Sequence, residues 1–213
     1  MRLPLFPLET VLYPGTPLPL HVFEPRYREM FGEVLRGQHR FGVVAVTRGR
    51  EVDPALPYQP VGCVAEVERV RPYPDGRLDV TARGRDRFTV EGLVQTSPYL
   101  VADVALLPEL PGARAPQRVR VAAGLFARYQ RMLGNLGGER REERAVPKDP
   151  VTASYLLAAA LQVDLADKQR LLDLPSAAER LSAEIRLLRR ELALLERLQR
   201  TGPAPMAGPF SLN

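Results

Sequence analysis

The spacing of apolar residues changes once along the chain, and this change limits the folds that the sequence can adopt. Up to about residue 106, short alternating segments are separated by glycine and proline, which is typical of β-strands. From about residue 115, apolar side chains recur every three or four positions, which is typical of helices. We therefore predict an α+β chain, with a strand subdomain over residues 1–110, a helical subdomain over 115–200 and a disordered, proline- and glycine-rich tail over 201–213.

Seven segments of the first half have the spacing of strands. They are residues 3–8, 17–22, 41–47, 61–68, 78–83, 88–93 and 99–106. The turn Pro74-Asp75-Gly76 predicts a hairpin, because proline pre-sets φ and glycine accepts a positive φ. Gly84 breaks the next run and predicts a bulge or a bend. A helix is expected to begin at Pro25 and to end before Gly37, and so many short strands predict a small antiparallel barrel or sandwich.

Capping residues mark the helices of the second half. A first helix is predicted over residues 116–133, followed by a polar loop over 134–144. Asp149-Pro150 opens a second helix that continues to Leu161, and Asp164 caps a third that ends near Leu172. Ser176 and Glu179 form a capping box for a long last helix.

The last helix carries a seam of apolar residues at alternating four- and three-residue spacing: Leu181, Ile185, Leu188, Leu192 and Leu195. The seam could form a coiled-coil dimer or the core contact of a helical bundle, so the chain could be a monomer or a homodimer. We favour the bundle because other helices lie nearby in the sequence. The opposite face, with Arg186, Arg189, Arg190 and Arg197 among Glu184, Glu191 and Glu196, is predicted to be solvated.

The sequence lacks the motifs that common catalytic sites require. It has no glycine-rich loop ending in Gly-Lys-Ser/Thr, and His21 and His39 have no partner at metal-ligand spacing. Cys63 is the single cysteine and is predicted to be a buried, inert thiol. Glu66 and Glu68 share one strand face, where they could act as an acid–base pair or lie on an exposed sheet surface. We expect no catalytic residue, no cofactor and no metal.

The charge of the chain is basic, with a net formal charge of +5 carried almost entirely by arginine. A basic chain can bind nucleic acid, but here the arginines are scattered among acidic residues, which weakens that interpretation. No apolar run is long enough to cross a bilayer, and the N-terminus has no signal-peptide pattern. The sequence therefore predicts a cytoplasmic protein without a membrane partner.

Several runs of residues, spread over roughly residues 1–199, resemble the N-terminal domain of Lon proteases: Leu3-Pro-Leu-Phe-Pro-Leu8, Val11-Leu-Tyr-Pro-Gly15, Leu18-Pro-Leu-His-Val-Phe-Glu-Pro-Arg-Tyr27, Val61-Gly-Cys-Val-Ala-Glu66, Gly84-Arg-Asp-Arg-Phe88, Leu165-Ala-Asp-Lys-Gln-Arg-Leu-Leu172 and Arg180-Leu181. The resemblance implies a PUA-like antiparallel β pseudobarrel with one short helix, followed by a C-terminal α-helical bundle. It also implies a free-standing, non-catalytic module, because the chain ends where the ATPase and peptidase modules would begin. Such a module would bind protein or peptide substrates and could act as an adaptor in proteolysis or protein quality control. The alternative is an RNA- or DNA-binding protein that uses the barrel and its basic surface.

Two groups of residues are candidates for partner binding. Phe6, Phe23 and Tyr27 join large apolar side chains to a backbone stiffened by proline, which could make a rigid surface. For Phe23 and Tyr27 we favour the alternative that they fix the first helix to the barrel. The proline-containing segment 48–60, with Val52, Leu56 and Tyr58, is the better candidate, because loops on a rigid scaffold often carry function.

Overall fold

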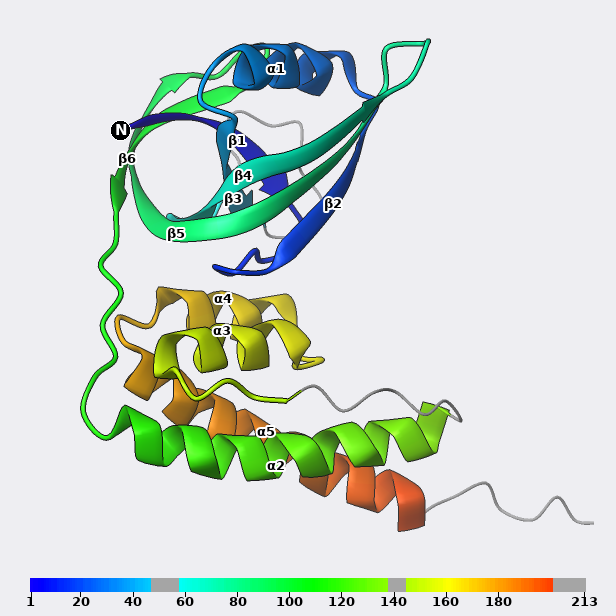
Figure 1. Ribbon diagram of the computed structural model, residues 1–213, viewed down its shortest axis with the longest axis vertical. Helices are drawn as coiled ribbons and strands as arrows, with labels where there is room; N and C mark the ends of the chain where they lie inside the picture. Colours follow the sequence, from blue (N-terminus) through cyan, green and yellow to red (C-terminus); the bar gives the residue numbers. More distant parts are fainter. Residues whose placement is uncertain (47–57, 138–144, 201–213) are drawn as a thin grey trace, which may run out of the picture.

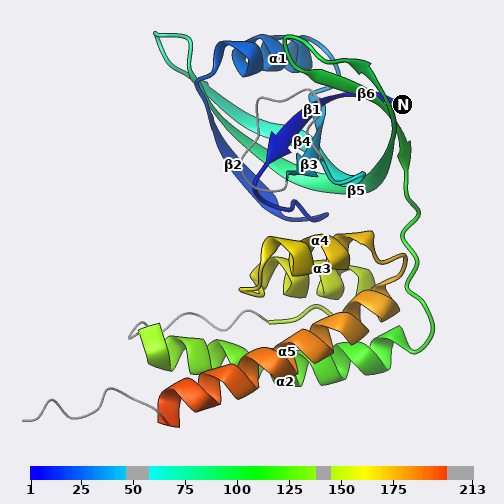
Figure 2. The same cartoon turned by 180° about the vertical axis from the view of Figure 1, so that it is seen from behind.

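The computed structural model describes residues 1–46, 58–137 and 145–200, so the predicted disordered tail lies outside it. The first half contains β1 (Arg2–Leu8), β2 (Pro17–Val22), α1 (Pro25–Arg36), β3 (Arg40–Ala45), β4 (Val61–Pro72), β5 (Leu78–Gln95) and β6 (Leu100–Leu106). The second half contains α2 (Ala115–Gly137), α3 (Pro150–Ala160), α4 (Leu165–Asp173) and α5 (Ala177–Arg200). Figures 1 and 2 show the strands and α1 at one end of the molecule and the other four helices at the opposite end.

The six strands form one sheet in the order β2-β5-β4-β3-β1-β6, and β5 also pairs with β6. The pairings therefore close a ring through β5, β4, β3, β1 and β6 (Figure 1). The prediction of a purely antiparallel sheet was wrong, because β1 pairs with β3 in parallel, with Leu5 opposite Gly42. Parallel neighbours need a long crossover connection, and here β2 and α1 supply it.

The predicted hairpin between β4 and β5 is confirmed, and its turn has the expected geometry. Gly76 has a φ of 82°, and its N–H donates to the carbonyl of Tyr73 at 3.0 Å. Gly84 does not break the second strand, because β5 continues through it to Gln95. The predicted bulge is present beside it, because Ala65 pairs with Gly84 but Cys63 pairs with Arg87, which leaves one extra residue on β5.

Gly84 is required by a close approach of the backbone. A Cβ atom at this position would lie 2.1 Å from the carbonyl oxygen of Tyr13, which belongs to the segment between β1 and β2. We expect Gly84→Ala to lower the free energy of unfolding by about 1–3 kcal/mol, because the backbone around Tyr13 must move. Gly92→Ala on the same strand is the control, since a Cβ there meets nothing within 4 Å. Equal losses in urea denaturation of the two variants would contradict this explanation.

The helix caps follow the sequence prediction. Asp149 accepts a hydrogen bond from the Thr152 N–H at 2.8 Å, and Asp164 accepts one from the Asp167 N–H at 2.7 Å. The hydroxyl of Ser176 accepts a hydrogen bond from the Glu179 N–H at 3.3 Å. α2, predicted over residues 116–133, is longer than expected, because residues 134–137 belong to it. The rest of the predicted loop, 138–144, lies outside the described residues.

The apolar seam of α5 is buried against other helices of the same chain, which agrees with the bundle interpretation. Leu181, Leu188, Leu192 and Leu195 belong to a buried cluster that also contains Phe126 of α2, and Ile185 packs against that cluster. The prediction that Glu184 lies on the solvated face was wrong, because its residue exposure is 0%. Glu184 is three residues after Leu181 and four before Leu188, so the helical repeat places it on the seam despite its charge.

Buried polar contacts join the strands to the helices. The Arg87 guanidinium, from β5, donates to the carbonyls of Leu172 and Leu174 at 2.8 and 2.7 Å. It also forms an ion pair with Glu109 at 2.7 Å, and only 1% of the Arg87 side chain is exposed. Tyr13 donates its hydroxyl to the carbonyl of Lys168 at 2.8 Å. The end of α4 is thus held by an arginine of the sheet, which satisfies carbonyls that a helix terminus leaves free.

Candidate functional site

The predicted partner-binding residues occupy different environments. Phe6 and Tyr27 are buried, with exposures of 7% and 6%, and their rings lie 4.4 Å apart. Tyr27 thus fixes α1 to the sheet, and neither side chain leaves much surface for a partner. Tyr58 is half-buried against a core cluster and forms an isolated bridge with Val46. The other two candidates, Val52 and Leu56, lie outside the described residues.

Phe23 is the predicted residue that the structure exposes. Along β2, Leu18 and Val22 point into the core, so the two-residue period directs His21 and Phe23 outward. Phe23 is 59% exposed, which contradicts the packing role that the sequence favoured for it. Its ring stacks on the imidazole of His21, with centroids 6.2 Å apart and an interplanar angle of 26°. The Glu24–Arg26 ion pair, at 2.8 Å, holds the turn that follows.

A hydrogen-bonded cluster supports the His21 ring from the neighbouring hairpin. His21 lies opposite Asp79, and its Nδ1 is 2.7 Å from the Asp79 carboxylate. The Tyr73 hydroxyl donates to the other oxygen of Asp79 at 2.6 Å. Hydrogen bonds from His21 and Tyr73 hold the pKa of Asp79 below its usual value, and the bond to Asp79 raises the pKa of Tyr73. The carboxylate therefore orients both rings.

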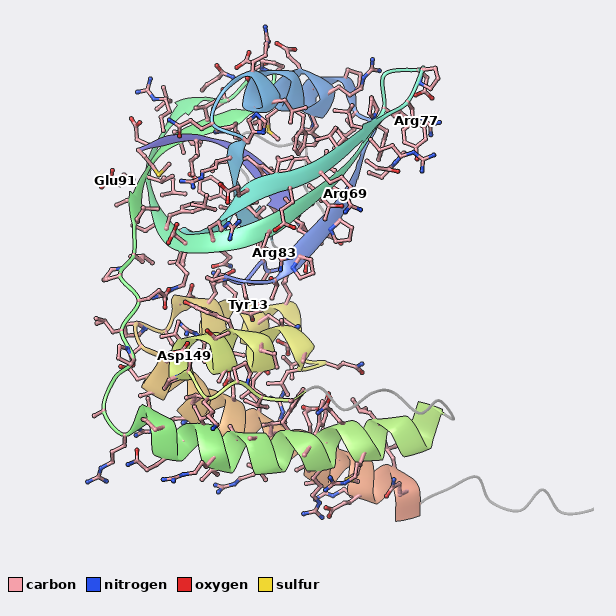
Figure 3. The ribbon with its side chains drawn as sticks, in the orientation of Figure 1. Tyr13, Arg69, Arg77, Arg83, Glu91 and Asp149 are labelled. Carbon is pink, nitrogen blue, oxygen red and sulfur yellow. The ribbon has the colours of Figure 1, made fainter. Side chains whose placement is uncertain are left out.

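Two arginines flank the Tyr73 ring. The guanidinium carbons of Arg71 and Arg77 lie 5.5 and 5.6 Å from its centroid, within the range of cation–π contacts. Figure 3 shows Arg77 at the tip of the hairpin, at the far end of the strand half from Tyr13 and the helices. We call Phe23, His21, Tyr73, Arg71 and Arg77 the hairpin-end surface.

A groove of about 540 Å³ lies between α1 and the same hairpin. Its lining is mostly apolar and carries one arginine and one glutamate: Pro25, Arg28, Glu29, Gly32, Leu35, Gly76 and Leu78. Pro25 follows Phe23 by two residues, and Leu78 pairs with Val22, so the groove adjoins the hairpin-end surface along the chain. The two together offer aromatic, apolar and cationic contacts on a rigid base.

The residues that the sequence singled out for possible chemistry lie in structural environments. Cys63 is fully buried, and burial raises the pKa of its thiol, so it is the inert thiol that the sequence predicted. Glu66 pairs with Arg40 and Arg85, and Glu68 with Arg83, which favours the exposed-sheet interpretation of these acids. The described residues contain no group of three or more His, Cys, Asp or Glu side chains suited to a metal ion.

Within residues 1–46, 58–137 and 145–200, none of the helices combines the length and the apolar character that a span of a bilayer needs.

The sequence predicts only some of the residues of the hairpin-end surface. The alternation in β2 puts Phe23 and His21 on one face, and the Pro-Asp-Gly turn brings Tyr73 and Arg77 to a hairpin tip. What the sequence does not contain is the register between β2 and β5, which places Asp79 opposite His21. Tyr73, Arg71 and Arg77 were therefore missed as members of the surface.

The chain matches a described family along most of its length. Residues 2–190 match the model of the ATP-dependent protease La (LON) substrate-binding domain. Among curated proteins, the Lon protease of Cytophaga hutchinsonii is 24% identical over 200 residues, which cover 91% of this chain and 25% of that protein. The Lon protease of Roseiflexus castenholzii is 29% identical over 196 residues, covering 91% and 24%. The chain thus spans about a quarter of the length of these relatives.

Two solved structures are similar in fold. A Lon N-terminal domain protein from Xanthomonas campestris has a TM-score of 0.63 at 26% identity, covering 85% of this chain and 95% of that one. The N-terminal domain of the Mycobacterium avium complex Lon protease has a TM-score of 0.59 at 18% identity, covering 89% and 98%. The second likeness concerns the fold alone.

Proposed function

The chain belongs to the family of the LON substrate-binding domain, and from this premise we propose that it recognises extended segments of unfolded proteins at the hairpin-end surface. The observation that carries the proposal is the 59% exposure of Phe23 on a base fixed by the His21–Asp79–Tyr73 cluster. An aromatic side chain that is already ordered loses little conformational entropy on binding, so its apolar area contributes fully to affinity.

The distribution of charge favours a polypeptide over nucleic acid as the partner. Several arginines of the strand half that are at least partly exposed are paired with carboxylates: Arg2, Arg40, Arg77, Arg83 and Arg85. Arginines that are neutralised in this way contribute little to a phosphate-binding surface. The adjoining groove is mainly apolar, which suits aliphatic and aromatic side chains of a peptide.

We further infer that the closed ring of strands is a PUA-like pseudobarrel. In this proposal the chain has two subdomains, the barrel over residues 1–110 and a helical bundle over residues 115–200. The ring of pairings and the position of the long helices after residue 115 support this division. In this proposal the chain is a non-catalytic protein- and peptide-binding module that acts as an adaptor in proteolysis or protein quality control. Its family membership supports the recognition role.

Phe23→Ser tests the proposed surface. We expect the affinity for a reduced, alkylated and permanently unfolded model protein to fall about thirtyfold, because loss of a central aromatic anchor costs about 2 kcal/mol or more. Binding would be measured by fluorescence anisotropy with the labelled unfolded protein.

Leu194→Ser is the matched control, because Leu194 is a 46% exposed apolar residue on α5, in the helical half. It is expected to leave the affinity unchanged. Equal affinity of the wild-type protein and Phe23→Ser would refute the proposed site. Tight binding of single-stranded RNA that weakens steeply with salt would favour the nucleic-acid alternative instead.

A further inference from the structure

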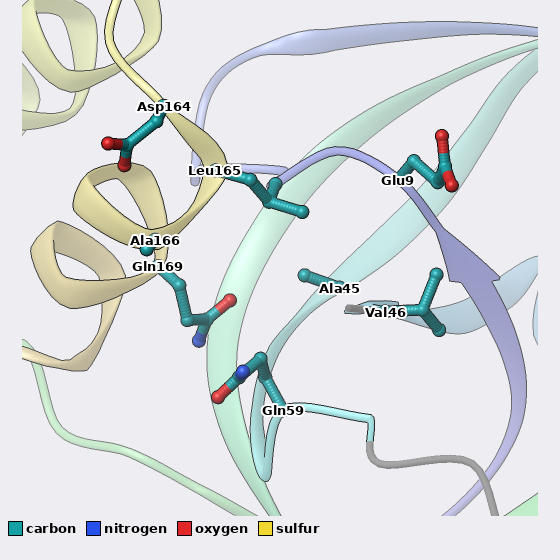
Figure 4. A pocket seen from close by; sticks show the side chains of 8 residues that line it. All are labelled: Glu9, Ala45, Val46, Gln59, Asp164, Leu165, Ala166 and Gln169. Carbon is teal, nitrogen blue, oxygen red and sulfur yellow. The ribbon is translucent and has the colours of Figure 1, made fainter. Parts of the chain in front are cut away.

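A second pocket lies where the strands meet the helices, away from the hairpin end. It has a volume of about 480 Å³, within the range of small-ligand sites. Residues from the ends of β1 and β3, from the segment before β4 and from the start of α4 line it: Glu9, Ala45, Val46, Gln59, Asp164, Leu165, Ala166 and Gln169. Figure 4 labels these residues around the space, with Glu9 and Asp164 at opposite sides of it. We call it the junction pocket.

Gln169 contributes an acceptor without a donor. Its Nε2 donates to the carbonyl of Val61 at 3.0 Å and to the Asp173 carboxylate at 2.8 Å, which fixes the orientation of the amide. Gln169 is 4% exposed, and its Oε1 accepts no hydrogen bond from the described part of the chain. Figure 4 shows this oxygen on the side of the amide that faces the pocket. A buried acceptor in this position is stabilised by a ligand that donates.

The charges of the pocket are all negative. Glu9 and Asp164 supply carboxylates, and none of the eight residues is a lysine, arginine or histidine. Asp164 also caps α4, which offsets the positive end of the helix. Ala45, Val46, Leu165 and Ala166 supply the apolar part of the wall. An anion is disfavoured here, whereas a cation on an aliphatic stem matches both parts of the lining.

We propose that the junction pocket binds a lysine or arginine side chain of the polypeptide that the chain recognises, so this inference rests on the proposed function. The aliphatic stem packs on Leu165 and Val46, and the carboxylates of Glu9 and Asp164 at the rim of the pocket attract the charged group. The Gln169 oxygen is shielded from solvent. The ligand reaches it when the Gln59 side chain, which has no hydrogen-bond partner among the described residues, moves aside.

Two labelled peptides test the proposal. Both are unstructured 12-residue peptides with aromatic residues near each end, and they differ only in a central lysine or norleucine. We expect the lysine peptide to bind about tenfold more tightly at low salt, since norleucine keeps the stem and loses the charge-assisted hydrogen bonds. Equal affinities of the two peptides would overturn the proposal.

A pair of double variants locates the effect. Glu9→Gln with Asp164→Asn removes both carboxylates of the pocket while asparagine still caps α4, and it is expected to reduce the tenfold ratio to about one. Asp86→Asn with Glu91→Gln makes the same change in net charge at exposed positions outside the pocket lining, and it should keep the ratio. Figure 3 shows Glu91 at the edge of the strand half. An equal effect of both pairs would mean that net charge alone sets the preference.

A direct titration separates this inference from the proposed function. Pentane-1,5-diamine is added to the wild-type protein and to the Glu9→Gln, Asp164→Asn variant, and the side-chain amide signals of Gln59 and Gln169 are followed by NMR. Shifts that occur only in the wild-type protein would support the cation site. If neither peptide binds, the proposed function is wrong, but such shifts would still support the site. Lack of any shift, together with lysine-independent peptide binding that still needs Phe23, would overturn the site and leave that function standing.

Discussion

Replacing Arg87 by alanine is expected to lower the free energy of unfolding by about 3–5 kcal/mol, measured by urea denaturation. The side chain is 1% exposed and donates to Glu109 and to the carbonyls of Pro108, Leu172 and Leu174. Alanine leaves these acceptors without their donor and removes the contact between β5 and the end of α4. The loss is large because buried polar groups without partners are costly.

Arg85→Ala is the matched control for this prediction. Arg85 lies two residues away on the same strand, is exposed and pairs with Glu66 at 2.5 Å. An exposed ion pair contributes roughly 1 kcal/mol or less, so the loss should be much smaller. If both variants lost the same stability, the importance assigned to the buried contacts of Arg87 would be wrong.

Glu184→Met is expected to stabilise the protein, and increasingly so as the pH rises. Both carboxylate oxygens of Glu184 are buried without a hydrogen-bond partner among the described residues. Burial raises the pKa of Glu184 well above its usual value, while Arg180, four residues earlier, opposes that shift. Methionine has a similar length and needs no partner, so it removes the cost of burying the acid.

The sign of the pH dependence follows from the raised pKa. The folded protein holds the proton of Glu184 more tightly than the unfolded chain, so this group adds no pH-dependent cost below the ordinary glutamate pKa of 4.5. Above it, wild-type stability falls relative to Glu184→Met by about 1.4 kcal/mol for each pH unit, until the folded-state pKa is reached.

Denaturation curves from pH 4 to pH 8 would measure this divergence between Glu184→Met and the wild-type protein. Glu196→Met, on the same helix, removes a carboxylate that pairs with Arg128 near the surface and should change stability by roughly 1 kcal/mol or less. A constant difference between Glu184→Met and the wild-type protein over this range would show that Glu184 is not buried as an acid.

Local signals in the sequence predict most of the elements. Caps such as Asp149 and Asp164, and the turn that ends in Gly76, act through atoms a few residues away, so their effect is visible in the sequence itself. The two-residue period of β2 likewise predicts which side chains face outward. These features account for the agreement in the helices and in the hairpin.

Contacts between distant segments were not predictable in the same way. Spacing shows which face a residue occupies but not what lies opposite that face, so the parallel pairing of β1 with β3 and the link from Arg87 to α4 were missed. The prediction that Glu184 is solvated was wrong for another reason. The charge of a residue indicates exposure, but the helical repeat places this one on the buried seam. The hairpin-end surface needed the register of β2 on β5, which no local pattern contains.

The place of β1 in the sheet has a consequence for how the chain matures during synthesis. β1 pairs on one edge with Gly42–Ala45 and on the other with Leu100–Asp103. About a hundred residues must therefore be translated after β1 before its second edge can be covered, and pairings so distant in sequence form slowly. Until then a nascent chain carries an open strand edge, which is where a ribosome-bound chaperone would be most useful.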